Sequence, residues 1–313
     1  MSTVLKRFSL VGVAVALLAT GCGTGPAKAG SAAIVGDQTI GLETVQDRTV
    51  TVLKKEPAAQ RMQDQGKLDG VSRLVLADEI VHRLVDNAAK RENITVDETK
   101  VYDAVQEKGG PEAASKESEQ DPSTIYRRQR DALAMGELAR RNLSTLEVVM
   151  DYFQVKDPKE AKEKAAEVAA DPSKMARFIQ EAPRTTSGQQ AAAANQKVRV
   201  TENPSLVQTT LWSVRPGTVV AFPIGQQQSS WMVAVVKERN EVSPTPGEED
   251  LLERVDPELL AAFGLRIAQY LSADLNIEVN PRYGVWDPTT AAVVATEGEK
   301  AGFVGVPATK NKS

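Results

Sequence analysis

The sequence predicts an α+β protein, because two kinds of periodicity occupy different parts of its 313 residues. Between Asp69 and Glu92 apolar residues recur at intervals of three and four, which is typical of one face of a helix. Between Leu146 and Val155 β-branched and aromatic residues gather instead, as they do in strands. Helical spacing returns from Pro257 to about Leu275, so helices flank a middle segment that contains strands.

The segment before position 144 predicts a short hairpin followed by helices. Residues 32–40 (AAIVGDQTI) indicate two extended pieces around a turn at Gly36-Asp37. The triplet Thr95-Val96-Asp97 is typical of an N-terminal helix cap, and the polar stretch 109–121 predicts a loop. We expect the helices of this segment over residues 42–54, 69–92, from the cap to 105, and 123–142.

The middle segment predicts an alternation of strands and helices. Asp157-Pro158 and Asp171-Pro172 each begin a helix, because proline is favoured in the first helical turn. The stretch 185–195 is of low complexity and predicts an irregular segment. The expected order is a strand over 146–155, the two helices, the irregular segment, a short strand over 198–200, a helix over 205–214, and strands over 219–224 and 231–236.

The last segment predicts a linker, a helix, an extended piece and a tail. Residues 242–250 (VSPTPGEED) are polar and contain two prolines, which indicates a linker. The helix over 257–275 follows, and residues 275–287 (LNIEVNPRYGVWD) read as extended. After Asp287 we expect a frayed tail.

The only cysteine of the chain, Cys22, follows a short apolar run. Lys6 and Arg7 precede that run, which is shorter than the roughly twenty residues that a membrane-spanning helix needs. The small residues before Cys22 resemble a bacterial lipobox, although Ala19 stands where leucine is commoner. The resemblance implies cleavage before Cys22 and attachment of diacylglycerol to its sulfur. An ordinary secretory signal with a chance cysteine is the alternative.

Composition narrows the chemistry that the chain can support. One cysteine cannot form a disulfide within the chain, and one histidine with one cysteine is too few for a zinc site. No Gly-rich phosphate-binding loop occurs, and a net charge of −4 gives no reason to expect nucleic acid. Aromatic residues make up 4%, which is low for an enzyme pocket. We therefore expect no cofactor, no metal and no nucleic-acid partner.

Several motifs together resemble one family of chaperones. The segments AAIVGDQTI, ITVDETKVYDAV and TIYRRQRDALAMGELARRN look like the N-terminal region of SurA-type extracytoplasmic chaperones. The segment LNIEVNPRYGVWD is similar to the ending of actinobacterial SurA-like lipoproteins. The middle segment has the element order of a parvulin-type prolyl isomerase, and its LWSVRPGTV, FPI and SSWMVAVVKER resemble the end of that domain.

The resemblance implies a mostly helical chaperone lobe formed by both chain ends, with an inserted parvulin-like α/β domain. If both ends share one lobe, the strand at Ala33–Val35 pairs with Ile277–Val279. The implied divisions are a lipoprotein signal peptide (1–21), a tether (22–31), a helical SurA-like N-terminal region (32–144), a parvulin-like domain (145–241), a C-terminal helix and strand that complete the lobe (242–287), and a tail (288–313).

The resemblance also bears on isomerase chemistry. Parvulins surround the twisting amide with two histidines on neighbouring strands and a Cys or Asp, beside an apolar pocket. Alignment places the two histidine positions near Asp151 and at Trp231, and the pocket positions near Asn203 and Val207. The only histidine, His82, lies outside this segment, so the double-histidine site is absent in any register. We expect a degenerate parvulin domain without catalytic residues.

The sequence predicts structural roles, rather than chemical ones, for the single histidine and for two of the tryptophans. His82 follows Asp78 and Glu79 on the predicted helix, which favours a solvated helix-face contact over catalysis. Trp212 and Trp231 are predicted core residues, and a peptide-binding platform is the alternative for Trp231.

Charged clusters are the last candidates. The acidic run Glu248-Glu249-Asp250 has no spaced partner and favours a solvated linker over a metal or acid–base site. The basic group of Arg127, Arg128 and Arg130 is short and predicts a helix surface rather than a nucleic-acid patch. The serines have no histidine nearby, and no G-x-S-x-G motif occurs, so serine-hydrolase chemistry is unsupported.

We predict a membrane-anchored, ATP-independent holdase chaperone that binds unfolded, newly exported polypeptides outside the cytoplasm. Its partners are these polypeptides and, through lipid on Cys22, the cell membrane. Two alternatives remain: an active parvulin-type peptidyl-prolyl isomerase with an unusual residue set, and a cell-envelope scaffold that binds one folded partner. Substrate-binding residues are unassigned, and we expect them between the helical lobe and the middle domain.

Overall fold

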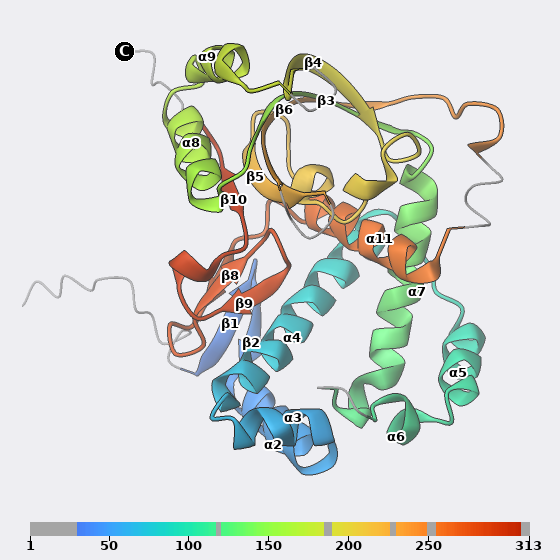
Figure 1. The fold of residues 1–313 in the computed structure, drawn as a ribbon. Coiled ribbons are helices and arrows are strands. Elements are labelled where there is room, and N and C mark those ends of the chain that lie inside the picture. Colours follow the sequence, from blue (N-terminus) through green and yellow to red (C-terminus); the bar gives the residue numbers. More distant parts are fainter. Residues whose placement is uncertain (1–29, 117–119, 185–189, 226–229, 249–254, 308–313) are drawn as a thin grey trace, which may run out of the picture.

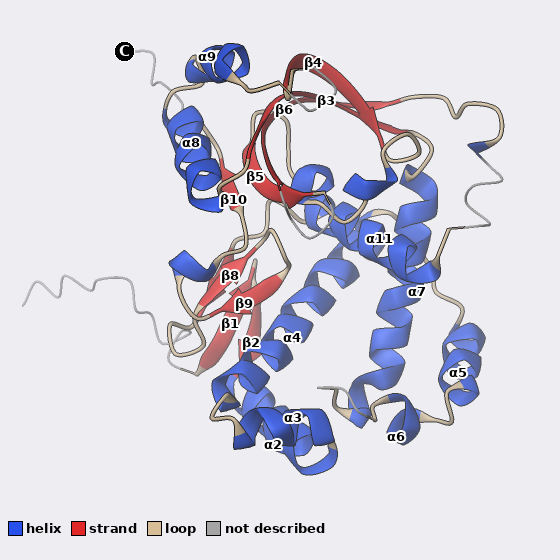
Figure 2. Cartoon of the chain, viewed as in Figure 1, coloured by secondary structure: helices blue, strands red, loops and turns tan. Residues whose placement is uncertain are grey.

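A computed structural model describes residues 30–116, 120–184, 190–225, 230–248 and 255–307. A group of helices lies below a strongly curved sheet (Figure 1), and most helices and strands occupy separate regions of the molecule (Figure 2). The predicted α+β class is confirmed. The predicted signal peptide and Cys22 lie outside the described residues.

The helices of the first segment form two groups that extend away from the sheet, one from residues 42–91 and the other from residues 98–142 (Figure 1). We call these two groups the legs of the lobe. Asp97 accepts a hydrogen bond from the backbone N–H of Thr99 at 2.9 Å, so the predicted helix cap is confirmed. The predicted loop at 109–121 contains a short helix, because Pro111 stands at a first helical position. The elements are α2 (Leu42–Lys55), α3 (Pro57–Asp64), α4 (Leu68–Arg91), α5 (Glu98–Glu107), α6 (Pro111–Ala114), η1 (Pro122–Thr124) and α7 (Ile125–Asn142).

A three-stranded sheet joins the two ends of the chain. Strands β1 (Ser31–Val35) and β2 (Gln38–Gly41) form a hairpin, and β1 pairs on its other side with β7 (Ile277–Val279). In this antiparallel pair Ala33 lies opposite Val279, so the predicted pairing of the two ends is confirmed. Ser31, which the sequence assigns to the tether, is the first residue of β1.

The middle segment forms a five-stranded antiparallel sheet with the order β10-β5-β6-β3-β4. The strand at one edge, β10 (Phe303–Gly305), comes from the end of the chain. Helices α8 and α9 cover one face, and the lobe packs against the other (Figure 1). The elements are β3 (Leu146–Val155), α8 (Pro158–Ala170), α9 (Lys174–Glu181), β4 (Ala192–Arg199), η2 (Pro204–Leu206), η3 (Thr210–Ser213), β5 (Val219–Ile224) and β6 (Ser230–Glu241).

Two predictions for the middle segment need correction. Strand β4 begins at Ala192, inside the stretch predicted as irregular, because its backbone pairs with β3. The helix predicted over 205–214 is instead two separate 3-10 turns, η2 and η3. The indole of Trp212 in η3 is fully buried and donates to the Leu206 carbonyl at 2.7 Å, which confirms its predicted core role.

Helix α11 (Pro257–Leu271) crosses from the lobe to the middle sheet (Figure 1). Phe263 packs edge-to-face on Trp212 with ring centroids 5.8 Å apart. Gly264 faces α7, where a Cβ atom would lie 1.8 Å from the carbonyl oxygen of Met135. The two helices can therefore cross this closely only because residue 264 has no side chain.

The segment after Asp287 is folded, and the prediction of a frayed tail is wrong for residues 288–307. Strands β8 (Val285–Asp287) and β9 (Ala292–Val294) form a hairpin, and the short η5 (Glu297–Glu299) follows. Strand β10 (Phe303–Gly305) then pairs with β5 in the middle sheet. This segment gave no periodic signal in the sequence, and its last strand is ordered by pairing with a distant strand.

Candidate functional site

The predicted isomerase positions lie on neighbouring strands but do not meet. Asp151 of β3 is opposite Val235 of β6, whereas Trp231 of β6 is opposite Val155 of β3. Four residues of strand separate the two positions, which is about 13 Å at the usual rise per residue. The geometry therefore does not gather these two side chains around one substrate amide.

Each of these two side chains has a structural partner. The Asp151 carboxylate accepts a hydrogen bond from the Asn195 backbone N–H at 2.7 Å, and Lys237 Nζ lies 3.5 Å away. Trp231 is 8% exposed in the core under α8 and α9, with Lys162 Nζ 5.9 Å from its ring centroid. The predicted core role of Trp231 is confirmed.

A pocket of about 370 Å³ opens on the opposite face of the sheet, and we call it the sheet pocket. Asn203 lines it near its predicted place, whereas Val207 is buried in the core and its neighbour Leu206 lines the pocket instead. Among the described residues that line it, none is a histidine, cysteine, aspartate or glutamate. Its polar groups come chiefly from Tyr152, Gln154, Gln196, Asn203 and Ser205.

A second pocket of about 330 Å³ lies where the lobe, the middle sheet and the C-terminal strands meet, and we call it the lobe–sheet pocket. Most of its lining side chains are apolar, in contrast to the sheet pocket. They come from α4, the segment between α11 and β7, the β7 and β8 strands, the segment after η3 and the β10 strand. The main ones are Leu84, Val214, Leu275, Ile277, Trp286 and Val304.

Charged side chains lie beside the lobe–sheet pocket without filling it. Arg91 Nη2 is 2.7 Å from an Asp274 carboxylate oxygen, and the pocket residue Arg215 is 3.7 Å from the other oxygen. The hydrogen bond from Arg91 lowers the pKa of Asp274, so this carboxylate is ionised at neutral pH. The apolar centre of the pocket suits an apolar polypeptide segment, and its charged rim can stay in contact with water.

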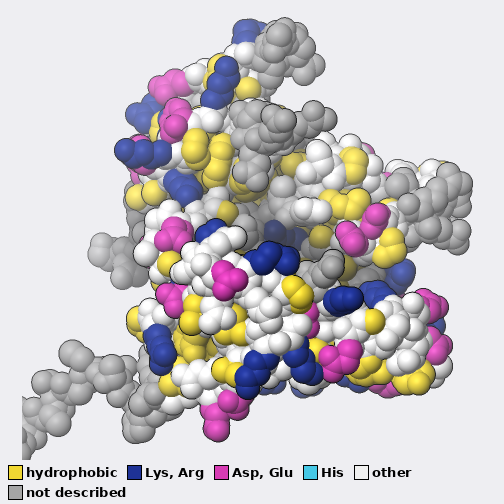
Figure 3. Space-filling view, turned by 60° about the horizontal axis from the view of Figure 1, so that its bottom comes forward, with side chains coloured by type: hydrophobic (Ala, Val, Ile, Leu, Met, Phe, Trp, Pro, Cys, Tyr) yellow, Lys and Arg dark blue, Asp and Glu magenta, His cyan; other side chains and the backbone are white. Residues whose placement is uncertain are grey.

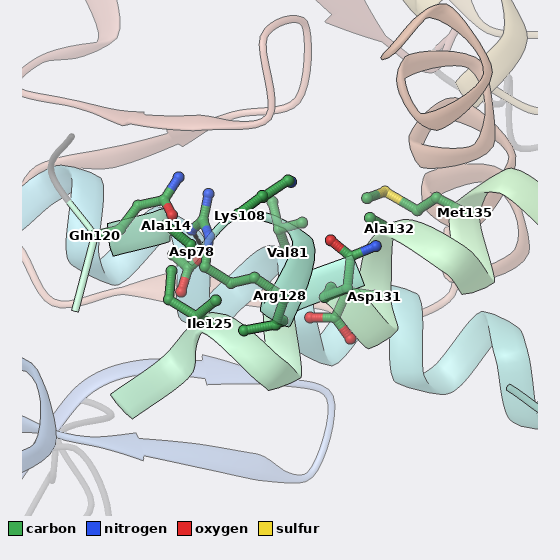
Figure 4. A pocket seen from close by; sticks show the side chains of 12 residues that line it. Asp78, Val81, Lys108, Ala114, Gln120, Ile125, Arg128, Asp131, Ala132 and Met135 are labelled. Atoms are coloured by element: carbon green, nitrogen blue, oxygen red, sulfur yellow. Dashed lines mark hydrogen bonds and ion pairs between the residues drawn. The ribbon is translucent and has the colours of Figure 1, made fainter. Parts of the chain in front are cut away.

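A third pocket, of about 270 Å³, lies between the legs of the helical lobe (Figure 4). Arg128 and Asp78, which both line it, form an ion pair with each other. Lys108 and Asp131 add further charge to the lining. Seen from below, this side of the molecule carries interspersed acidic and basic groups (Figure 3). The third pocket is therefore less suited than the lobe–sheet pocket to apolar ligands.

An ionic cluster braces the two legs of the lobe. Arg127 of α7 lies 2.6 Å from Asp78 and 2.7 Å from Glu79, both on α4. Arg48 of α2 pairs with the same two carboxylates. The prediction of a helix surface is wrong for Arg127, which is only 21% exposed, whereas Arg130 does lie at the surface in a pair with Glu98. Buried charges need such partners, so the cluster holds α2, α4 and α7 together.

His82 does not make the solvated contact that the sequence predicts. Its Nδ1 lies 2.9 Å from an Asp131 carboxylate oxygen on α7, and both side chains are mostly buried. Asp78 and Glu79 are occupied by arginines from other helices, which is why His82 turns to a different partner. Burial raises the pKa of Asp131, and the hydrogen bond with His82 opposes that shift.

Glu248 is not part of a solvated linker, contrary to the sequence prediction. Its carboxylate lies 2.8 Å from Arg199 Nη2 and accepts hydrogen bonds from Thr201 and from the Thr245 backbone. Burial raises the pKa of Glu248, but these hydrogen bonds and the Arg199 charge outweigh it and lower the pKa to about 2. The neighbouring Glu249 and Asp250 lie outside the described residues.

The residues that the structure describes contain no cluster of three or more His, Cys, Asp or Glu side chains arranged to hold a metal ion. No helix among them is both long enough and apolar enough to cross a membrane.

Comparisons with known proteins add little. No family model and no curated protein matches the chain. A peptidylprolyl isomerase (PrsA) from Bacillus anthracis is 14% identical with a TM-score of 0.23, over 63% of this chain and 94% of that chain. The corresponding protein from Bacillus cereus is 12% identical with a TM-score of 0.20, over 75% and 86% of the two chains. Similarity this low supports no argument about function.

The residues of the lobe–sheet pocket were not assigned from the sequence. Leu84, Val214 and Trp286 are far apart along the chain, and each reads locally as an ordinary core residue. Two expectations from the sequence pointed to this place: binding between the lobe and the middle domain, and the pairing of the two chain ends, which brings β7 beside the lobe.

Proposed function

We propose that this protein is a lipid-anchored, ATP-independent holdase chaperone that binds unfolded, exported polypeptides outside the cytoplasm. The lobe–sheet pocket carries the proposal, because open apolar side chains between two parts of a protein favour binding of an apolar segment. The sequence motifs that resemble SurA-type chaperones support the same function. Such binding needs no nucleotide, because mass action alone sets the occupancy.

Suppression of aggregation tests the proposal. A chemically unfolded model protein is diluted into buffer with the full-length chain, and light scattering is followed. We expect suppression, and we expect Ala273→Glu to weaken it about tenfold, because an apolar client would have to desolvate the new carboxylate. Ala273 is an exposed residue of the lobe–sheet pocket, so this change should not unfold the protein.

The matched control is Ala113→Glu, at an exposed residue of α6 that does not line this pocket. It should suppress aggregation as the unchanged chain does. Equal weakening by both changes, or by neither, would contradict binding in the lobe–sheet pocket. Capture of one folded partner in fixed stoichiometry, without effect on unfolded proteins, would favour the scaffold alternative.

The isomerase alternative is favoured by one observation, the sheet pocket, where Tyr152, Gln154 and Asn203 can hydrogen-bond a bound peptide. Isomerisation of a proline peptide has an uncatalysed barrier of about 20 kcal/mol, so catalysis is measured against a slow background. Acceleration that Tyr152→Phe removes would establish an active isomerase at the sheet pocket. A rate equal to the uncatalysed one is the outcome that the holdase proposal expects.

A further inference from the structure

Strand β10 occupies an edge of the middle sheet, although its segment arrives from the lobe side of the molecule (Figure 1). Phe303 lies opposite Ala221, and Val304 lies opposite Val220, in an antiparallel pair with β5. Both β5 residues are fully buried. We call residues 301–307 the C-terminal strap.

Without the strap, β5 would be an apolar edge strand with unpaired backbone groups, which is a template for strand addition. The other edge strand of the sheet, β4, is different. Its middle residues are exposed and polar, Asn195 has a φ of +54°, and its pairing with β3 is irregular. These features protect a strand edge from added strands, whereas the part of β5 from Val219 to Ala221 lacks them and lies before the proline of that strand, Pro223.

Backbone pairing holds the strap over only a short stretch, and Phe303 and Val304 pack against the core clusters on the two faces of the sheet. Its pairing with β5 spans three residues, and all three remain partly exposed. The backbone N–H of Ala301 donates to Asp287 at 2.8 Å, and Lys162 donates to the carbonyl of Lys300. Val306, directly after β10, is 76% exposed. The strap is thus a short, extended, apolar segment, the same chemistry as an unfolded client.

We infer that the edge of β5 is a binding surface for an extended apolar polypeptide strand, and that the strap occupies this edge until a client strand replaces it. The inference rests on the proposed holdase function. Exchange keeps the number of strand hydrogen bonds unchanged, so binding is weak and reversible without nucleotide. Val304 and Val306 also line the lobe–sheet pocket, so departure of the strap opens that pocket.

A peptide with the sequence of residues 300–307 (KAGFVGVP), labelled with fluorescein, is the probe. A chain truncated after Lys300 has a free β5 edge and should bind the probe at least about tenfold more tightly than the full-length chain, whose strap competes intramolecularly. A probe with proline in place of its central Val304 should not bind, because proline is disfavoured inside a strand that pairs with a neighbour.

A disulfide lock tests exchange without removing any residue. The full-length chain carries Cys22→Ser, Val220→Cys and Val304→Cys, and the two new cysteines lie directly opposite each other across the strand pair. The oxidised protein should lose binding of the probe, and reduction should restore it. The chain with Cys22→Ser and Val304→Cys alone is the control and should respond to neither treatment.

Gly302→Ala is a second way to loosen the strap, in case truncation unfolds the chain. A Cβ atom at Gly302 would lie 2.4 Å from the carbonyl oxygen of Ala221, so this variant should bind the probe more tightly than the unchanged chain. Equal binding by oxidised and reduced locks would overturn the inference, because clients would then bind away from the β5 edge.

The two proposals fail in different ways. If the unchanged and the locked chains suppress aggregation equally, the holdase function stands and strand exchange falls. If loosened chains bind the probe but no chain suppresses aggregation, strand exchange stands and the holdase function falls.

Discussion

Arg239 and Arg266 are largely shielded from water, and neither forms an ion pair with a carboxylate among the residues that the structure describes. Arg239 of β6 lies 3.8 Å from the ring centroid of Tyr270 on α11 and donates to the Trp212 carbonyl. Arg266 of α11 donates to backbone carbonyls at 208 and 288. Burial lowers the pKa of each to about 10, so both stay charged at neutral pH. Their donors therefore secure irregular segments that have no strand partners.

Glu248 makes the free energy of unfolding depend on pH in the acidic range. Its pKa falls to about 2 on folding, from a usual value of 4.5, so its contribution is complete above pH 4.5 and is lost as pH falls toward 2. We expect Glu248→Gln to cost roughly 3 kcal/mol of unfolding free energy at pH 7 and to reduce the acid dependence. Urea unfolding followed by circular dichroism at pH 7, 4 and 3 measures both effects.

The control for this prediction is Glu107→Gln, at an exposed residue of α5. It should leave the unfolding free energy nearly unchanged at every pH. An acid dependence that is the same in Glu248→Gln as in the unchanged chain would show that other groups cause it.

Among the elements, α11 decides how the lobe and the middle sheet fit together. It contacts α7, α4 and η3, and its residues Phe263 and Ile267 belong to a core cluster shared by both parts. The spacing of these apolar residues predicted the helix from sequence. Its close crossing with α7 was not predicted, because a glycine in a helix carries no signal of what lies opposite it.

Two glycines near this crossing should respond in opposite directions to alanine. At Gly264 a Cβ atom would overlap the Met135 carbonyl, so Gly264→Ala should destabilise the protein by about 2 kcal/mol or more. At Gly136 on α7 the nearest atom is the flexible Arg140 Nη1 at 3.5 Å, so Gly136→Ala should stabilise by about 0.5–1 kcal/mol. Urea unfolding compares the two, and equal effects would contradict the close crossing.

Elements with strong periodicity were predicted well, and those without it were missed. Helix α4 and strand β3 lie within one or two residues of their predicted ends. Strand β10 and the 3-10 turns η2 and η3 differ from prediction, because elements of three or four residues are too short to show a repeat. Composition alone predicts the absence of a double-histidine site, because the chain has one histidine. The surroundings of Glu248 and His82 were not predicted, because their partners Arg199 and Asp131 are far away in sequence.

At the scale of the whole molecule, distant segments are interleaved. The N-terminal β1 pairs with β7, and the C-terminal β10 pairs with β5 of the middle sheet. Chain ends thus contribute to both the lobe and the sheet, and the lobe–sheet pocket lies where they meet. Closing such long loops slows folding, so we regard the pocket as one of the last features to form.

Lipid attachment at Cys22 is the remaining whole-molecule prediction. Cells that express the full chain with a labelled fatty acid should incorporate the label into this protein, and Cys22→Ser should abolish incorporation because the acceptor sulfur is lost. Gel electrophoresis with autoradiography measures the label. Unlabelled wild-type protein would contradict the anchor while leaving the holdase proposal open to its own test.

The sequence by itself determined the α+β class, the order of the long helices and strands, and the lack of the imidazoles that parvulin chemistry needs. These properties follow from local periodicity and from composition, which are present in every conformation of the chain. Only the tertiary structure decided that residues 301–307 cover β5, that arginines from two helices occupy Asp78 and Glu79, and that an apolar pocket opens between lobe and sheet. Those features arise from contacts between distant residues, whose packing depends on the entire fold at once.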